Sequence, residues 1–160
     1  MAPFLRILHD EYAPAFFGRM VTHVIDRIVE GGVPVAEEQG IVAPVRTFST
    51  MILLHHSALG VTDIAQALGI THAAVIKYIR TLSDLGLVER GRDNQNARRR
   101  PIFLTEKGKA QVELIDLYMR RIAEVYTQMF EEIGIDVYDG MRRMNDALDK
   151  RDFGQRMRED

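Results

Sequence analysis

Two short helical segments separated by a single tight turn constrain the fold of this chain more than any other feature. Thr62 to Leu68 and Thr71 to Leu85 each place apolar residues at helical spacing. Each begins with a threonine, whose hydroxyl can accept a hydrogen bond from a free backbone amide of the first turn. Gly69 lies between them and suits a left-handed C-cap. The pattern predicts a tight helix-turn-helix.

A β-hairpin is expected directly after this helix pair. Beyond Gly86, Leu87 to Arg90 and Ile102 to Leu104 have the composition of two short strands. The segment between them is polar and rich in arginine, so it is unsuited to packing on an apolar surface. Because its natural partner is anionic, we interpret the hairpin as a wing.

Helical periodicity also dominates the chain before this unit. A first helix is expected from Pro3, with Pro14 kinking or restarting it and residues 31–32, both glycine, ending it. Val33 to Ile41 is interpreted as a surface connection. A second, largely buried helix is then expected from Pro44 to Gly60.

Two further helices are expected after the hairpin. Thr105 suits the N-cap of a long helix that ends near Glu132, and apolar residues recur along it every seven positions. Asp136 opens a last helix, followed by a charged tail that we expect to be frayed. The apolar stripe of the long helix includes Ile115, Ile122 and Met129, and that of the last helix Val137, Met141, Met144 and Leu148. Such stripes need a partner, either a second copy of the chain or an intramolecular core.

Length and composition narrow the class of protein. A chain of 160 residues suits one domain. It has no cysteine, which excludes disulfides, thiolate zinc sites and cysteine nucleophiles. The first ten residues lack the pattern of a signal peptide, and no apolar run approaches the ~20 residues of a membrane helix. We therefore expect a cytoplasmic protein without membrane partners.

The charge is unevenly distributed along the chain. The net charge is −2, but residues 71–109 carry 9 Lys and Arg against 4 Asp and Glu. Residues 1–70 carry 4 against 7, and residues 110–160 carry 8 against 12. A positive island between acidic flanks is expected where one surface meets phosphates. The other reading is a solvated run of charge.

The run from Gly60 to Gly108 resembles the MarR family of winged helix-turn-helix regulators. The resemblance lies in the ALGI turn, in Val75 and Leu82 seven positions apart, in the strand entry LGLVER and in the exit LTEKG. It implies a mainly α fold with a small β-hairpin wing in a single domain over residues 1–160. The winged helix-turn-helix DNA-binding lobe would span residues 44–105, and the dimerisation helices residues 1–30 and 106–157.

The second helix of the pair would enter the major groove of DNA. Its core-facing residues are expected to be Val75, Ile79 and Leu82, so the residues on the opposite side of the helix face outward. The residues expected to contact DNA from this helix are Thr71, His72, Ala73, Ile76, Lys77 and Arg80. The family typically has a small polar residue where this chain has Ile76. Ile76 therefore either reads a thymine methyl or is partly buried in the core.

The wing would enter the minor groove. The family's wing carries an Asp-x-Arg motif, which aligns with Asn96, Ala97 and Arg98. Asn96 replaces the acid, so it can orient Arg98 by a hydrogen bond but without a charge pair. Arg99 could share the role of Arg98, and Arg92 lies at the same tip. One such module offers only ~600–1,000 Å² of contact, so recognition is expected to need a homodimer.

Many relatives are switched by a small aromatic or anionic effector bound between the dimer region and the DNA-binding lobe. The residues of this chain that would line that crevice are Tyr12, Phe16, Arg46, His55 and Tyr118. The alternative is that Arg46 is a surface salt-bridge partner and that the aromatic residues are core or dimer contacts. His55 and His56 are adjacent and no H-E-x-x-H pattern occurs, so no metal or other cofactor is expected.

The function implied is that of a sequence-specific DNA-binding transcriptional regulator, most often a repressor. It would act as a homodimer on a pseudo-palindromic site of double-stranded DNA, with or without release by a small-molecule effector. The alternative is a winged-helix module for protein interaction or weakly specific DNA packaging, without an effector. The sequence has no Gly-rich phosphate loop, nucleophile elbow or candidate triad, so an enzyme is not expected.

Overall fold

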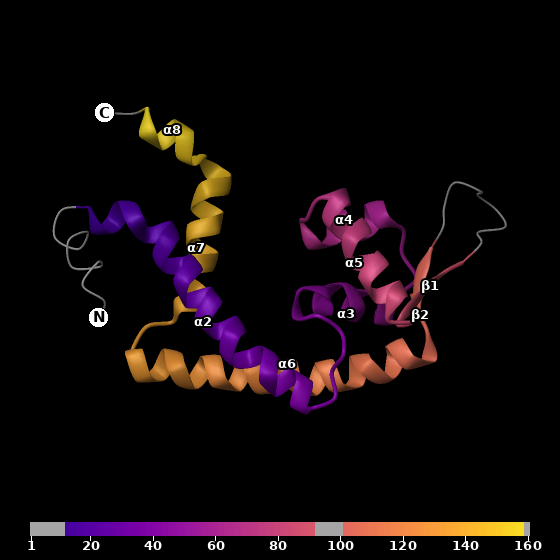
Figure 1. Cartoon of the computed structure of the whole chain (residues 1–160). Coiled ribbons are helices and arrows are strands. Elements are labelled where there is room, and N and C mark those ends of the chain that lie inside the picture. Colours follow the sequence, from indigo (N-terminus) through magenta and orange to yellow (C-terminus); the bar gives the residue numbers. More distant parts are fainter. Residues whose placement is uncertain (1–11, 92–100, 159–160) are drawn as a thin grey trace. The chain divides into compact units, whose positions relative to one another are not determined.

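The computed structural model describes residues 12–91 and 101–158 (Figure 1). In these ranges the fold is mainly helical with an antiparallel β-hairpin, as the sequence predicts. The chain divides into two compact units, Met1–Asp116 and Leu117–Asp160, and the long helix α6 belongs to both. The elements in order are η1 (Ala13–Phe16), α2 (Phe17–Glu38), η2 (Val45–Thr47), α3 (Phe48–His56), α4 (Val61–Leu68), α5 (His72–Asp84), β1 (Val88–Arg90), β2 (Ile102–Leu104), α6 (Glu106–Ile133), α7 (Val137–Lys150) and α8 (Phe153–Met157).

Helix α2 continues further along the chain than the sequence indicates. The prediction that residues 31–32 end it was wrong, and so was the surface connection from Val33, because α2 continues to Glu38 with Pro34 inside it. Two glycines cost a helix about 1 kcal/mol each relative to alanine, which weakens it without ending it. Ala36, 3% exposed, anchors the last turn in the core, and the left-handed Gly40 (φ 78°) ends the helix.

Helix α3 is shorter than predicted. Pro44 precedes its first turn as expected, but the helix stops at His56 rather than Gly60. The chain is extended beyond it because Leu59 pairs with Ile102, its amide donating to the Ile102 carbonyl (3.1 Å) and its carbonyl accepting from the Ile102 amide (2.9 Å). This pairing adds Leu59 to the edge of the hairpin.

Helices α4 and α5 form the predicted helix-turn-helix. Gly69 is left-handed (φ 63°) and Thr71 caps α5 by accepting a hydrogen bond from the Ala74 amide at 3.2 Å, as predicted. The cap predicted at Thr62 was wrong. Helix α4 begins one residue earlier, with Gly60 at the cap, and the Asp63 carboxylate accepts the hydrogen bond of the Gly60 amide at 3.2 Å.

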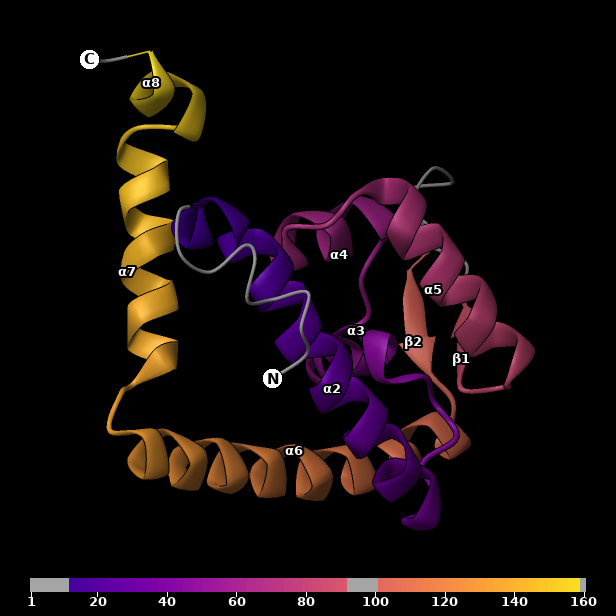
Figure 2. The same ribbon diagram turned by 60° about the vertical axis from the view of Figure 1, so that its left-hand side comes forward.

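The core of the first unit is built around α5. One face of α5 is fully buried, and helix α5 packs beside β1 (Figure 2). Burial of this face stabilises the fold by removing apolar surface from water. The buried residues drawn from the surrounding elements include Met51, Ile64, Val75, Ile79, Leu82, Leu87, Ile102 and Ile115.

Short hydrogen bonds join the start of α6 to the two residues that follow α5, ahead of the hairpin. Strands β1 and β2 pair antiparallel, with Val88 opposite Leu104. Thr105 caps α6 as predicted, accepting from the Gly108 amide at 3.0 Å, and its hydroxyl donates to the Gly86 carbonyl at 2.7 Å. The Lys107 ammonium donates to the Leu85 carbonyl at 2.8 Å. These bonds fix the start of α6 against the end of α5.

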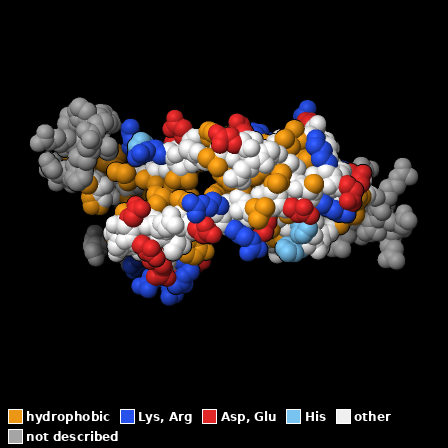
Figure 3. Space-filling view, turned by 90° about the horizontal axis from the view of Figure 1, so that it is seen from below, with side chains coloured by type: hydrophobic (Ala, Val, Ile, Leu, Met, Phe, Trp, Pro, Cys, Tyr) orange, Lys and Arg blue, Asp and Glu red, His pale blue; other side chains and the backbone are white. Residues whose placement is uncertain are grey.

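The second unit contains the rest of α6 with α7 and α8. Asp136 caps α7 by accepting from the Asp139 amide at 2.8 Å, as predicted. The tail expected to fray instead forms α8, because Asp152 and Gln155 build a capping box and the Arg156 guanidinium donates to the Ala147 carbonyl. Figure 3 shows one face of the molecule, on which exposed apolar side chains lie among charged ones. On α7, Val137, Met141 and Met144 are each about two-fifths exposed.

Candidate nucleic-acid interface

Helix α5 presents two chemically different faces. Val75, Ile79 and Leu82 are 0–1% exposed. Because successive helix residues point about 100° apart, a second stripe faces away from this core. All six α5-associated residues singled out from the sequence are exposed: Thr71, His72, Ala73, Ile76, Lys77 and Arg80. All six are therefore accessible to a partner, and Ala73, Ile76, Lys77 and Arg80 lie on the side of α5 away from its buried stripe.

Ile76 does not belong to the core. Its side chain is 52% exposed, although neighbouring Val75 is completely buried. Complete burial is therefore excluded, and what the exposed half of Ile76 contacts stays a prediction. Ile76 lies on the outward face, about 90° around the helix axis from the centre of the buried stripe.

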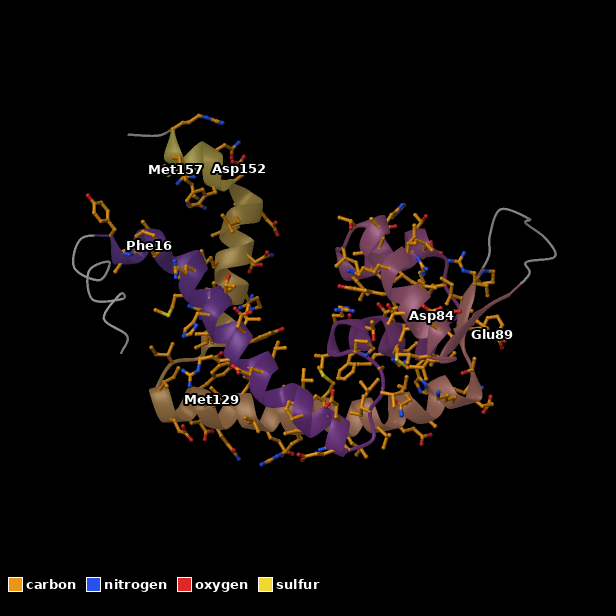
Figure 4. The ribbon with its side chains drawn as sticks, viewed as in Figure 1. Phe16, Asp84, Glu89, Met129, Asp152 and Met157 are labelled. Carbon is orange, nitrogen blue, oxygen red and sulfur yellow. The ribbon has the colours of Figure 1, made fainter. Side chains whose placement is uncertain are left out.

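The basic side chains of α5 are free to meet a partner. Among the described residues, Lys77 and Arg80 have no side-chain hydrogen bond or ion pair. Two acids are exposed on the same supersecondary unit, Asp84 at the end of α5 and Glu89 on β1 (Figure 4). Neither forms an ion pair with a described base. The positive charge of Lys77 and Arg80 is therefore not neutralised by the described part of the fold.

Two other bases of the positive island are already engaged. Lys107 donates to the Leu85 carbonyl, and Lys109 pairs with Glu106 on α6. The charge count over residues 71–109 treated these two lysines as available to a partner. Their expected position in the first turn of α6, next to other elements of the fold, could have indicated that they are engaged. The bases available on the described surface are those of α5, together with Arg90 at the end of β1.

The wing residues predicted to bind DNA lie outside the described residues. These are Arg92, Asn96, Arg98 and Arg99. The described ends of the hairpin are joined, because the Gly91 amide donates to the Pro101 carbonyl at 2.8 Å.

The residues expected to line an effector crevice are divided between the two units. Tyr12 and Phe16 are 58% and 38% exposed near the start of α2, and Figure 4 labels Phe16. Arg46 and His55 are also exposed. Tyr118 belongs to the second unit and is 4% exposed, and burial, with a contribution from Tyr126, raises the pKa of its phenol. Their grouping into one site stays a prediction.

The histidines of α3 do not gather ligands around them. His55 and His56 contact each other edge to face, with ring centres 5.8 Å apart. No three His, Asp or Glu side chains within residues 12–91 and 101–158 are placed to share a metal ion. None of the helices in the described ranges combines the length and the apolar character needed to cross a membrane.

Comparison with known proteins concerns both the helix pair and the whole chain. A family model described as the IclR helix-turn-helix domain matches residues 51–92, a range that begins within α3 and ends just beyond β1. The match is therefore to the helix-turn-helix and not to the flanking helices. No curated protein matches the chain.

Solved structures resemble the chain over most of its length. The transcriptional repressor CouR, bound to a 23-mer DNA duplex, is 22% identical, with a TM-score of 0.67 over 86% of this chain and 95% of its own. A MarR-family transcriptional regulator from Rhodococcus sp. RHA1 is 21% identical, with a TM-score of 0.58 over 91% and 98%. PcaV from Streptomyces coelicolor, in complex with its natural ligand, is 19% identical, with a TM-score of 0.60 over 79% and 92%.

Proposed function

We propose that this chain, which has the fold of the MarR-family transcriptional regulators, is itself a sequence-specific DNA-binding regulator and acts as a repressor. It binds through α5 in the major groove and through the wing in the minor groove. Its chemistry is recognition rather than catalysis, and it works in the cytoplasm, where it can reach DNA.

The observation that carries the proposal is the outward face of α5. This face combines two bases without described partners, Lys77 and Arg80, with groups able to contact base edges. A helix with one fully buried face and one such exposed face can enter a groove without unfolding its own core. The structural likeness to CouR, which is bound to DNA in its structure, supports this use of the fold.

We propose further that the functional unit is a homodimer. Helix α2 exposes Phe17, Met20, Val24 and Ile25, each between 43% and 51% exposed. Helix α7 separately exposes Val137, Met141 and Met144. Burying such surface against a second copy would stabilise the pair by ~25 cal/mol for each Å² of apolar area removed from water. Two copies would place two α5 helices on half-sites about one helical turn apart.

The proposal includes a small-molecule effector, which the complex of PcaV with its natural ligand supports. Arg46 would pair with an anionic group, and the exposed residues Tyr12, Phe16 and His55 are the candidates for contact with an aromatic one. Such a molecule would release DNA only if it binds one spacing of the two α5 helices better than the other.

Selection of bound sites from a pool of random duplexes tests the proposed function. We expect an enriched pseudo-palindrome whose half-site centres are about 10 base pairs apart. Enrichment of a single unpaired motif would contradict dimeric binding. Binding without any enriched motif would indicate DNA packaging, and absence of binding would indicate a protein-interaction module.

Sedimentation equilibrium tests the dimer separately. We expect a dimer at micromolar concentration that dissociates when Met20 and Val24 are both replaced by aspartate. The exposed pair Glu37 and Glu38 on the same helix, replaced by lysine, serves as the control. A stable monomer of the unaltered chain would contradict the dimer.

A further inference from the structure

Ile76 stands out on α5 because its chemistry differs from that of its neighbours. Along the outward stripe, Lys77 and Arg80 are charged and Ala73 is small. Ile76 alone among these presents a large apolar side chain, and 52% of it is exposed. The core of the first unit does not need this exposed part of Ile76, since the buried face of α5 is already complete at Val75, Ile79 and Leu82.

The position of Ile76 restricts what it can contact in a complex. The outward face of α5 spans about 100° from Ile76 through Arg80 to Lys77, so Ile76 lies at one margin of the stripe. Ile76, in the second turn of α5, lies within about 60° of Ala73 and Arg80 around the helix axis, so its side chain is within reach of the groove when those two residues face it. Its side chain then meets base edges or the adjoining deoxyribose.

An isoleucine has no hydrogen-bond donor or acceptor, so it can distinguish base pairs only by an apolar contact. On the edges that base pairs present in the major groove, the apolar group is the C5-methyl of thymine. Cytosine lacks this methyl and presents an amino donor instead. A half-exposed isoleucine against that amino group would remove it from water without returning a hydrogen bond.

We infer that Ile76 is a specificity-determining residue that selects a thymine in each half-site by packing against its C5-methyl group. The inference rests on the proposed function and deepens it, because it names the chemical group that α5 reads. Lys77 and Arg80 can bind phosphates or the acceptor edges of bases, and Ile76 supplies the discrimination between thymine and cytosine.

Deoxyuridine provides the test, because it pairs like thymidine but lacks the methyl. Each thymine of the selected duplex is replaced in turn by deoxyuridine, and the affinity of the unaltered protein is measured at fixed salt. We expect one thymine per half-site at which the replacement weakens binding roughly fourfold, the effect of losing one buried methyl. The Ile76→Ala variant should bind the thymine and deoxyuridine duplexes equally.

Two control variants separate this contact from a general loss of binding. Arg80→Ala should weaken binding to both duplexes and keep the fourfold difference between them. Ile76→Val, which retains a branched apolar side chain, should keep most of it. Because Ile76 is half-exposed and outside the buried face of α5, its variants should shift the melting temperature only slightly, as circular dichroism can verify.

The outcomes distinguish this inference from the function on which it rests. A selected duplex that is insensitive to deoxyuridine at every thymine would overturn the inference alone, as would a methyl effect that persists unchanged in Ile76→Ala. Either result would show that Ile76 does not read a thymine methyl. If random-site selection enriches no duplex, the proposed function fails and the inference fails with it.

Discussion

Gly108, in the first turn of α6, lies against the backbone carbonyl of Leu87 so closely that a β-carbon at residue 108 would overlap the oxygen. The same segment is held by the hydrogen bond from the Thr105 amide to the Leu87 carbonyl, at 3.0 Å. The absence of a side chain at residue 108 is therefore what allows α6 to begin directly beneath the strand entry. This contact gives a physical reason for the glycine in the LTEKG exit of the wing.

Replacing Gly108 by alanine is expected to destabilise the fold. The added methyl meets backbone rather than a flexible side chain, so we expect the free energy of unfolding to fall by about 1–3 kcal/mol. Urea denaturation followed by circular dichroism measures it. Gly31→Ala is the matched control, because Gly31 lies inside α2 with nothing within 4 Å of the point that a β-carbon would occupy. It should raise stability by up to ~1 kcal/mol, and equal effects of the two changes would contradict the proposed role of Gly108.

Gln111 joins two segments that lie far apart in the sequence. Its side-chain amide donates to the Gly40 carbonyl at 3.0 Å, and its side-chain oxygen accepts from the Val42 amide at 2.8 Å. Gln111 is 9% exposed, so these are sheltered hydrogen bonds. They fix the connection after α2 to the first half of α6.

Gln111→Met preserves the length of this side chain and removes both hydrogen bonds. We expect a loss of about 2 kcal/mol of unfolding free energy, because two part-buried backbone groups lose their partner. Amide hydrogen exchange should also speed up at Val42. Glu113→Met, at an exposed position on the same helix, is the control and should change stability by less than about 0.5 kcal/mol. Unchanged exchange at Val42 in Gln111→Met would contradict this role.

Thr47 and Thr50 are both 0% exposed, but their hydroxyls are in opposite situations. The Thr47 hydroxyl donates to the Pro44 carbonyl at 2.7 Å. The Thr50 hydroxyl has no hydrogen-bond partner among the described residues. A buried polar group without a partner lowers stability, because it gives up water and gains nothing in return.

Valine at these two positions should therefore have opposite effects. We expect Thr50→Val to raise the free energy of unfolding by about 1 kcal/mol, and Thr47→Val to lower it by a similar amount. Thermal melting of the two variants in the same buffer measures the difference. If both changes shift the melting temperature in the same direction, the assignment of the two hydroxyls is wrong.

Local features of the fold could be predicted from the sequence, because they depend on neighbouring residues. The left-handed turn at Gly69 and the caps at Thr71, Thr105 and Asp136 each involve contacts within a few positions. The outward stripe of α5 followed from the helical period in the same way. The exposure of Ile76 could not be read from it, because a residue at the margin of a stripe can face either way.

The errors arise where distant contacts outweigh local preference. Residues 31–32 favour a helix end, but α2 continues to Glu38. Burial of Ala36 holds the last turn of the helix, and the two hydrogen bonds of Gln111 hold the segment that follows it. Similarly, α3 ends early because Leu59 pairs with Ile102, 43 positions further along. Nothing near either segment in the sequence signals these partners.

Asp139 should make the stability of α7 depend on pH. Its carboxylate accepts a hydrogen bond from Arg142 at 2.8 Å and one from Arg143 at 2.6 Å. The hydrogen bond from Arg142 is the main cause that holds the pKa of Asp139 below its ordinary value. Desolvation raises this pKa in part, and the positive charge of Arg143 lowers it further. Because the folded-state pKa is depressed, the carboxylate stabilises the fold above the unfolded-state pKa. This contribution disappears as the pH falls through the folded-state value.

Asp139→Asn should therefore lower the melting temperature at neutral pH, and the difference from the unaltered chain should shrink below about pH 4. Melting curves recorded between neutral pH and about pH 2 test this, with Glu132→Gln as an exposed control. A difference that stays constant over the whole range would show that the charge of Asp139 is not responsible.

Arg98 and Lys77 should affect DNA binding in different ways, because one is expected to follow the DNA backbone through the minor groove and the other to face base edges from α5. Arg98→Ala should weaken binding to all duplexes and reduce the slope of log K against log salt by about 1 for each arginine removed. Lys77→Ala should instead change which duplexes are preferred in random-site selection. Arg121→Ala, whose guanidinium pairs with Glu124 on α6, is the control and should leave affinity and slope unchanged. If Arg98→Ala binds with unchanged affinity and unchanged slope, the wing does not contact DNA through Arg98, and α5 must carry the interface without it.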